Sequence, residues 1–248
     1  MKKIVNLSIL LLLLSVNLSA QTEKGTLVIG SQFQIFSGKE DETRDGIDSF
    51  NYYKNNSFNI SPQIGYFILT NFEAGLNYEY SYQKYINNHD GSYPGSYDYS
   101  STSKRNIHSF GVFTKYHQPI YRGFGVFGEL TLNCNLEKTE ETSKYHQTTN
   151  PDFFSSTYTK QTGTKFNAAL NMGLEYYIKK RFGIELKFGL LSYSTGPIHE
   201  TITYENFSGN PPPEESDITS SDFRFSPLSI SVGFKFNITT FPVKAKKK

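Results

Sequence analysis

A two-residue alternation of apolar and polar side chains dominates the sequence. From Phe72 to Gln83, apolar and aromatic residues occupy the even positions, and polar residues or glycine occupy the odd positions. The same pattern runs from Thr164 to Ile178. Because successive side chains of a β-strand point to opposite faces, each segment predicts a strand with one apolar and one polar face. Six further segments follow the pattern less strictly: Thr26 to Phe36, Ser57 to Leu69, Ile107 to His117, Phe124 to Leu136, Phe182 to Ser194, and Phe223 to Phe236.

The connections between these eight predicted strands alternate between short and long. The short connections are Thr70-Asn71, Gln118 to Gly123, and Lys179-Lys180-Arg181. The long connections are Ser37 to Asn56, Lys84 to Asn106, Glu137 to Gly163, and Thr195 to Asp222. This arrangement predicts an all-β fold, an eight-stranded antiparallel up-and-down barrel built from four hairpins.

Residue size indicates which face of the predicted barrel points outward. Within the predicted strands the polar face carries nine glycines, whereas the apolar face carries Gly128 alone. The interior of an eight-stranded barrel is just wide enough for side chains to fill it. The small polar face therefore fits inside and the apolar face fits against lipid, as in a transmembrane barrel. A soluble lipocalin-like barrel, with its apolar face inside, is the alternative. Within the predicted strand from Ser57 to Leu69, Pro62 lacks a backbone N–H and predicts a local bulge.

The N-terminus has the features of an export signal. Lys2 and Lys3 precede the apolar run Ile9 to Leu14, and Ala20 supplies a small residue at the predicted cleavage point. The predicted organisation is a signal peptide over 1–20, a barrel over 21–236 and a short basic periplasmic tail over 237–248. Without the signal the chain contains 23 basic and 23 acidic residues. Because there is no excess of basic residues, a nucleic-acid-binding surface is not expected.

Four segments carry a resemblance to a known family. They are the signal, the hairpin from Phe58 to Tyr78, the strand from Phe124 to Leu130, and the final strand from Ser229 to Phe236. With them the chain resembles small outer-membrane β-barrels of the OmpA/OmpX-like kind, in the outer membrane protein beta-barrel domain family. The resemblance implies a Gram-negative outer-membrane location, contact with outer-membrane lipids, and insertion by the barrel-assembly machinery. The chain departs from the family pattern after Phe236, where many members end.

Charged residues on the polar face predict a cross-linked lumen. Buried charges need partners or solvent, so these side chains and His117 are expected to pair and to close the barrel. A narrow path for ions or small solutes along the same charges is the alternative. The predicted lumen charge network is Glu73, Glu79, Lys115, Glu129, Lys165, Glu175, Glu185, Lys187 and Lys235.

Aromatic residues suggest two further features. Those near the short turns predict an aromatic girdle at a membrane interface: Tyr66, Phe72, Tyr116, Phe124, Tyr176, Phe182, Phe234 and Phe236. In the second long connection, Tyr93, Tyr97 and Tyr99 lie among serine, glycine and asparagine, a composition typical of adaptable recognition surfaces.

No convincing catalytic constellation is found, and no cofactor or metal site is predicted. The only arrangement compatible with a lipid-modifying enzyme pairs His108 with Ser192 or Ser194 near the outer interface. The sequence therefore favours a structural or surface-interaction role through the long extracellular connections. A narrow pore and, less favoured, an outer-membrane lipid-modifying enzyme are the alternatives.

Overall fold

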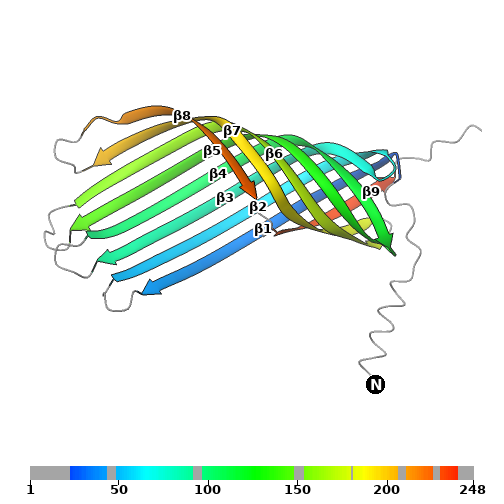
Figure 1. The fold of residues 1–248 in the computed structure, drawn as a ribbon, viewed down its shortest axis with the longest axis horizontal. Coiled ribbons are helices and arrows are strands. Elements are labelled where there is room, and N and C mark those ends of the chain that lie inside the picture. The colour runs from blue at the N-terminus through cyan, green and yellow to red at the C-terminus, as the bar shows by residue number, and fades with distance from the viewer. Residues whose placement is uncertain are drawn as a thin grey trace, which may run out of the picture.

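The computed structural model contains a single antiparallel sheet (Figure 1). It describes residues 23–43, 49–91, 97–147, 154–179, 181–205, 211–225 and 230–239, so the predicted signal peptide lies outside the described residues. Within these ranges no helix is long and apolar enough to cross a membrane. The strands are β1 (Thr26–Thr43), β2 (Ser49–Leu69), β3 (Phe72–Gly91), β4 (Tyr97–Tyr121), β5 (Phe124–Gln147), β6 (Phe154–Lys179), β7 (Phe182–Glu205), β8 (Glu214–Phe225) and β9 (Ile230–Thr239).

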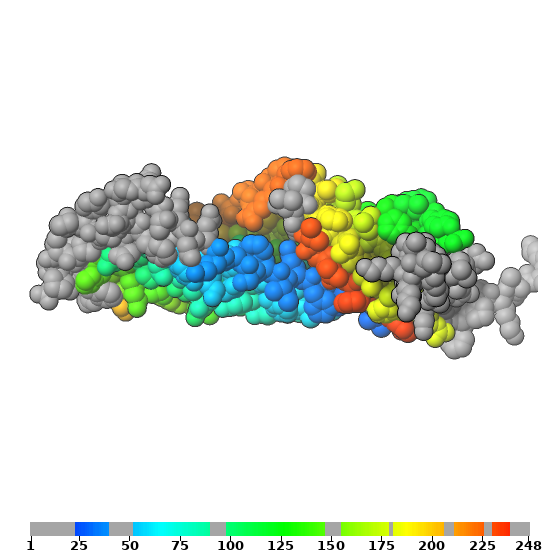
Figure 2. Space-filling model, turned by 90° about the horizontal axis from the view of Figure 1, so that it is seen from below, coloured from blue at the N-terminus to red at the C-terminus, as the bar shows by residue number. Residues whose placement is uncertain are grey.

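Eight of these strands close into a ring. Strands β1 to β7 pair in chain order, and β9 lies between β7 and β1 (Figure 2). Strand β8 pairs with the outer part of β7, from Leu191 opposite Phe225 onward. The prediction of one final strand from Phe223 to Phe236 is therefore wrong. The structure has two strands in this region, β8 and β9, and residues 226–229 between them lie outside the described residues.

The sheet is apolar outside and polar inside, as the sequence predicts. Outward side chains such as Leu130 and Leu170 are exposed, whereas Glu129 and Glu175 are buried in the lumen. Glycine placement gives the same result: a Cβ on Gly111 would overlap the Asn133 side chain. A Cβ on the outward Gly128 would meet no atom within 4 Å. The lipocalin-like alternative is thus excluded by the orientation of the faces.

The strands extend much further from the short turns than predicted. The predicted long connection from Lys84 to Asn106 is largely strand, because β3 and β4 stay paired from Lys84 opposite Lys104 to His89 opposite Tyr99. The other three long connections likewise consist mostly of paired strand. These segments lack the apolar–polar alternation that marks a half-buried strand. A sheet that projects into water needs no apolar face, so the alternation disappears while the backbone pairing continues.

The short connections are tight turns. Thr70-Asn71 links β2 to β3, with Asn71 at φ 65°. The second turn is only Arg122-Gly123, with φ 41° and 85°, the positive pair that suits a two-residue hairpin. The predicted six-residue connection from Gln118 to Gly123 is therefore too long, because β4 continues through an irregularity between Pro119 and Tyr121.

Two further predictions need correction. Pairing of β2 with β3 passes from Ile60 opposite Tyr80 to Gln63 opposite Asn77 in one register, so no bulge forms at Pro62. The last strand also runs beyond the predicted boundary at Phe236, because β9 ends at Thr239. Alternation continues there: Asn237 points inward and is buried, Ile238 is exposed, and both pair with β1.

Candidate functional site

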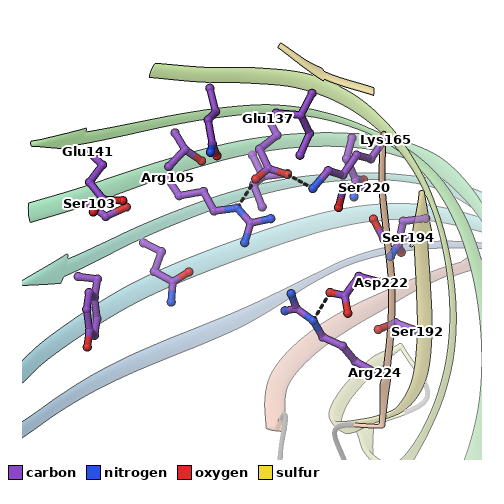
Figure 3. Close-up of a pocket in the computed structure, with 18 of the residues that line it drawn as sticks. Ser103, Arg105, Glu137, Glu141, Lys165, Ser192, Ser194, Ser220, Asp222 and Arg224 are labelled. Atoms are coloured by element: carbon purple, nitrogen blue, oxygen red, sulfur yellow. Dashed lines mark ion pairs between the residues drawn. The ribbon is translucent and has the colours of Figure 1, made fainter. Parts of the chain in front are cut away.

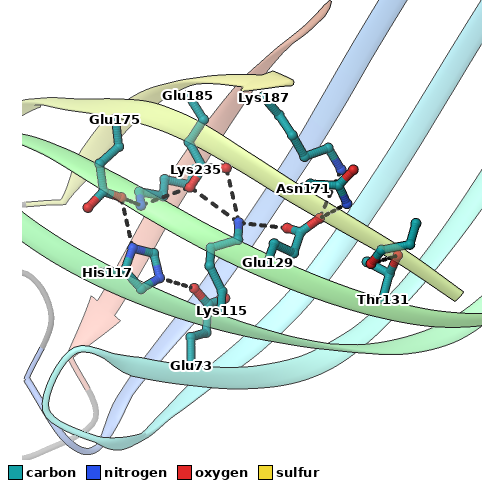
Figure 4. Close-up of polar contacts among 11 residues, drawn as sticks. Glu73, Lys115, His117, Glu129, Thr131, Asn171, Glu175, Glu185, Lys187 and Lys235 are labelled. Carbon is teal, nitrogen blue, oxygen red and sulfur yellow. Dashed lines mark hydrogen bonds and ion pairs between the residues drawn. The ribbon is translucent and has the colours of Figure 1, made fainter. Parts of the chain in front are cut away.

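Lys115 lies at the centre of the inner half of the lumen. It projects from β4 and is 2% exposed. Its Nζ atom is 3.2 Å from Glu129 Oε2 on β5 and 3.1 Å from Glu185 Oε2 on β7 (Figure 4). Because β4 and β7 are not neighbours in the sheet, the contact between Lys115 and Glu185 crosses the lumen.

A second buried lysine continues this chain of contacts. Lys235 Nζ on β9 is 2.9 Å from Glu185 Oε1 and 2.5 Å from Glu175 Oε2. His117, which is completely buried, lies between two carboxylates. Its Nδ1 is 2.9 Å from Glu175 Oε2 and its Nε2 is 2.9 Å from Glu73 Oε2 (Figure 4). Strands β3, β4, β6, β7 and β9 are thereby connected through side chains alone.

Lys187 on β7 is the outermost member of this series of contacts. Its Nζ is 3.0 Å from Glu129 Oε1, which also accepts a hydrogen bond from the Asn171 side chain at 3.2 Å. Four carboxylates thus face three ammonium groups and one imidazole in an unbroken series. We call this series the luminal ion-pair network: Glu73, His117, Glu175, Lys235, Glu185, Lys115, Glu129 and Lys187.

Two members of the predicted charge set lie outside the network. Glu79 accepts a hydrogen bond from the Asn59 side chain at 2.6 Å. Lys165 is 3.3 Å from Glu137, which is also 2.6 Å from Arg105 Nε. These groups lie farther along the lumen toward its outer mouth, and Figure 3 shows the pairs around Glu137.

Four inward aromatic side chains pack around the network. Phe67, Phe113, Phe127 and Tyr177 are each at most 3% exposed. Lys115 Nζ lies 4.7 Å from the Phe127 ring centroid, and Lys235 Nζ lies 4.4 Å from that of Tyr177, distances typical of cation–π contacts. The sequence analysis gives these aromatic residues no role, although all four stand at inward-facing positions of their strands, on the same side as the polar residues.

The free volume of the lumen decreases from the outer mouth toward the network. The outer vestibule has a volume of about 930 Å³ and is lined by strands β3 to β8 (Figure 3). A middle cavity of about 160 Å³ lies among amide and hydroxyl side chains such as Gln63, Asn77 and Asn133. A cavity of about 10 Å³ lies beside Lys115 and Lys235.

The vestibule contains one of the three predicted recognition tyrosines. Tyr99 lies on β4, not in a loop, and its ring is 4.9 Å from that of Tyr145 on β5. Burial and the neighbouring Tyr99 and Glu141 raise the pKa of Tyr145. Tyr97 begins β4, and Tyr93 lies outside the described residues.

The predicted girdle residues lie beside one another near the short turns. Phe72 is opposite Tyr116, Phe124 opposite Tyr176, and Phe182 opposite Phe236. Phe182 also stacks on Phe234 with ring centroids 6.0 Å apart, and Tyr66 is exposed on β2. The eight aromatic residues thus follow the inner ends of the strands.

The arrangement considered for a lipid-modifying enzyme is not formed. His108 Nδ1 is 2.8 Å from the Tyr78 hydroxyl, and His108 is exposed at an outward position of β4. Ser192 and Ser194 instead line the vestibule on β7 (Figure 3). The sheet therefore separates the histidine from both hydroxyls. Within the described ranges no three potential metal-ligating side chains form a group.

An apolar exterior, a charged lumen and tight turns at one end define a transmembrane β-barrel turned inside out relative to soluble barrels. The profile of the outer membrane protein beta-barrel domain family matches residues 7–238. The chain belongs to this family and is an outer-membrane β-barrel protein.

Solved structures of two small barrels are similar to this chain. The outer membrane protein OprG from Pseudomonas aeruginosa is 12% identical with a TM-score of 0.45, over 90% of this chain and 100% of that one. Neisserial surface protein A (NspA) is 13% identical with a TM-score of 0.32, over 86% of this chain and 97% of that one. No curated protein gives a significant match.

Proposed function

We propose that this protein is a closed, non-conducting barrel that acts at the cell surface through the sheet its strands form beyond the membrane. The luminal ion-pair network is the observation that supports the closed state. It joins six strands through contacts of 2.5–3.2 Å between side chains on opposite and neighbouring walls. A permeating ion would have to separate these pairs.

Energy and space both favour a closed lumen. Removing the partner from a buried charge costs about 3–5 kcal/mol, so transient opening of several pairs is rare. The space beside Lys115, about 10 Å³, is at the lower limit of what one water occupies. The narrow pore is therefore the less favoured candidate.

Single-channel recording in planar bilayers tests this proposal. The wild-type barrel should give no stepwise conductance above the lipid baseline. A Lys115→Ala/Lys235→Ala variant, which removes the two central cations, serves as a control that insertion has occurred and should admit ions. Stable conductance steps from the wild-type protein would show that the lumen conducts.

The proposed surface role rests on strand length. β5 and β6 contain 24 and 26 residues, whereas about 9–11 tilted residues cross a bilayer. At roughly 3.3 Å per residue, the 14 to 16 or so residues left over extend each strand roughly 45–55 Å beyond the membrane along its own direction. This outer sheet carries the polar vestibule.

A shortened hairpin tests the surface role. Joining β3 to β4 without residues 84–104 removes paired outer strand and leaves the pairs below Gln83 opposite Arg105 in place. Cells bearing this variant should retain a heat-modifiable barrel but lose adherence to protein-coated surfaces. Adherence equal to that of wild-type cells would contradict a role for the outer sheet.

A further inference from the structure

Over the residues that the structure describes, the outer half of the barrel is not closed. Within the described ranges, β1 pairs with β9 only from Thr26 to Phe33, and from Ser37 to Thr43 its assigned pairing is with β2 alone. On the other side, β8 pairs along one edge with β7 and has no second assigned neighbour. The outer part of β1 and the free edge of β8 therefore border a seam, which Figure 1 shows widening away from the ring.

Unpaired strand edges are binding sites for extended polypeptide. In an antiparallel strand, alternate residues direct their N–H and C=O groups to opposite sides, so half of the backbone groups of β8 point toward the seam. Such groups pair readily with an added strand unless the edge is covered. Strand β8 offers a 12-residue edge, and nearly all its side chains are exposed.

Apolar exposure is greatest at the same place. Ile35 on β1 is 77% exposed, and Phe223 and Phe225 on β8 are each 68% exposed, the highest values among the large hydrophobic side chains that the structure describes. Phe223 and Phe225 lie opposite Tyr193 and Leu191 on the apolar exterior, so an added strand with apolar side chains at alternate positions would continue that exterior face across the seam.

Charge identifies the kind of strand. The two bordering segments, residues 34–43 and 214–225, contain seven acidic residues and two basic ones, Lys39 and Arg224. Arg224 is already paired with Asp222, and Lys39 lies over the Tyr52 ring. On β8, Glu214, Glu215 and Asp217 are all exposed, and Asp217 Oδ1 lies 2.9 Å from His199 Nδ1 on β7. Like charges on the two edges disfavour their direct pairing and attract a cationic segment.

We propose that the seam binds an extended polypeptide segment in which basic and apolar residues alternate, adding it as a strand to the free edge of β8. This inference rests on the proposed surface role and specifies the partner class. It does not depend on whether the lumen conducts.

The experiment uses the full-length barrel in neutral-lipid vesicles and a fluorescent peptide of alternating lysine and valine, about ten residues long. One control peptide has glutamate in place of lysine. A second keeps every lysine but has proline at alternate valines, which preserves charge and blocks strand pairing. Fluorescence anisotropy gives the affinity, and hydrogen exchange with mass spectrometry locates the contact.

We expect the lysine–valine peptide to bind and to slow amide exchange in residues 214–225, with neither control peptide doing so. A Glu214→Gln/Glu215→Gln/Asp217→Asn variant should bind roughly tenfold more weakly, because exposed charge pairs each contribute modestly. Glu140→Gln, a charge change on β5 away from the seam, should leave the affinity unchanged.

Three results would overturn the inference: no binding, equal binding of the proline peptide, or binding without slower exchange in β8. Conductance recorded from the same preparation separates this outcome from a failure of the closed-barrel proposal. If the barrel conducts ions and binds the peptide, only the closed state is refuted. If the barrel shows no conductance and does not bind the peptide, only the strand addition is refuted.

Discussion

Replacing Lys115 with methionine is expected to lower the free energy of unfolding by about 3 kcal/mol. Lys115 contacts Glu129 and Glu185, whose side chains are 0% and 5% exposed. Loss of one partner from a buried ion pair costs about 3–5 kcal/mol. The lower end applies here, because Glu129 keeps Lys187 and Glu185 keeps Lys235.

Lys165→Met provides the matched control. Lys165 pairs with Glu137, which retains Arg105 and lies beside the vestibule, so the expected cost is about 1 kcal/mol. A double variant, Lys115→Met/Glu185→Gln, should recover part of the loss, because one of the two carboxylates that lose Lys115 is then replaced by a neutral amide.

Unfolding is followed by urea titration of the barrel in lipid vesicles. The chain has no tryptophan, so the folded fraction is measured from mobility on unboiled gels and extrapolated linearly to zero urea. Equal losses for Lys115→Met and Lys165→Met would refute the view that the buried network, and not charge in general, stabilises the barrel.

The same assay checks three other substitutions. Gly111→Val should cost about 3 kcal/mol through collision inside the lumen, whereas Gly128→Val on the outer surface should change stability by less than about 0.5 kcal/mol; similar values for the two would contradict the face assignment. Leu130→Arg should cost about 2–4 kcal/mol if this residue faces the bilayer midplane, and Ile218→Arg, beyond the membrane, about 0.5 kcal/mol or less; the reverse order would misplace the membrane. Tyr99→Ala should cost about 1 kcal/mol through loss of the ring contact with Tyr145, and an unchanged midpoint would show that this contact contributes nothing.

The membrane-spanning half of the fold was predictable because lipid on one side and a narrow lumen on the other impose opposite demands on alternate residues. Leu130 and Glu129 express these demands at neighbouring positions, one exposed and the other 1% exposed. Beyond the membrane both faces meet water, so the pairing of Lys84 with Lys104 leaves no apolar pattern.

The charged lumen was predictable as a set of residues but not as a set of pairs. The two-residue alternation predicts that Lys115 and Glu185 point inward. The pairing of each carboxylate with a particular lysine depends on the register and shear of the strands, and the sequence pattern does not reveal these. The aromatic residues of the lumen were missed for another reason. Phe127 is apolar at an inward position, and its packing against Lys115 and His117 becomes visible only in the structure.

Accessibility of spin labels along β5 tests the inside-out barrel most directly. Labels are attached at single cysteines in lipid vesicles, using the native Cys134, which is exposed, and introduced sites at 130–133 and 135–136 in a Cys134→Ser background. Labels at even positions should collide with lipid-soluble oxygen, and those at odd positions should be shielded from it. Oxygen accessibility highest at odd positions, or without a two-residue period, would contradict the orientation on which the account depends.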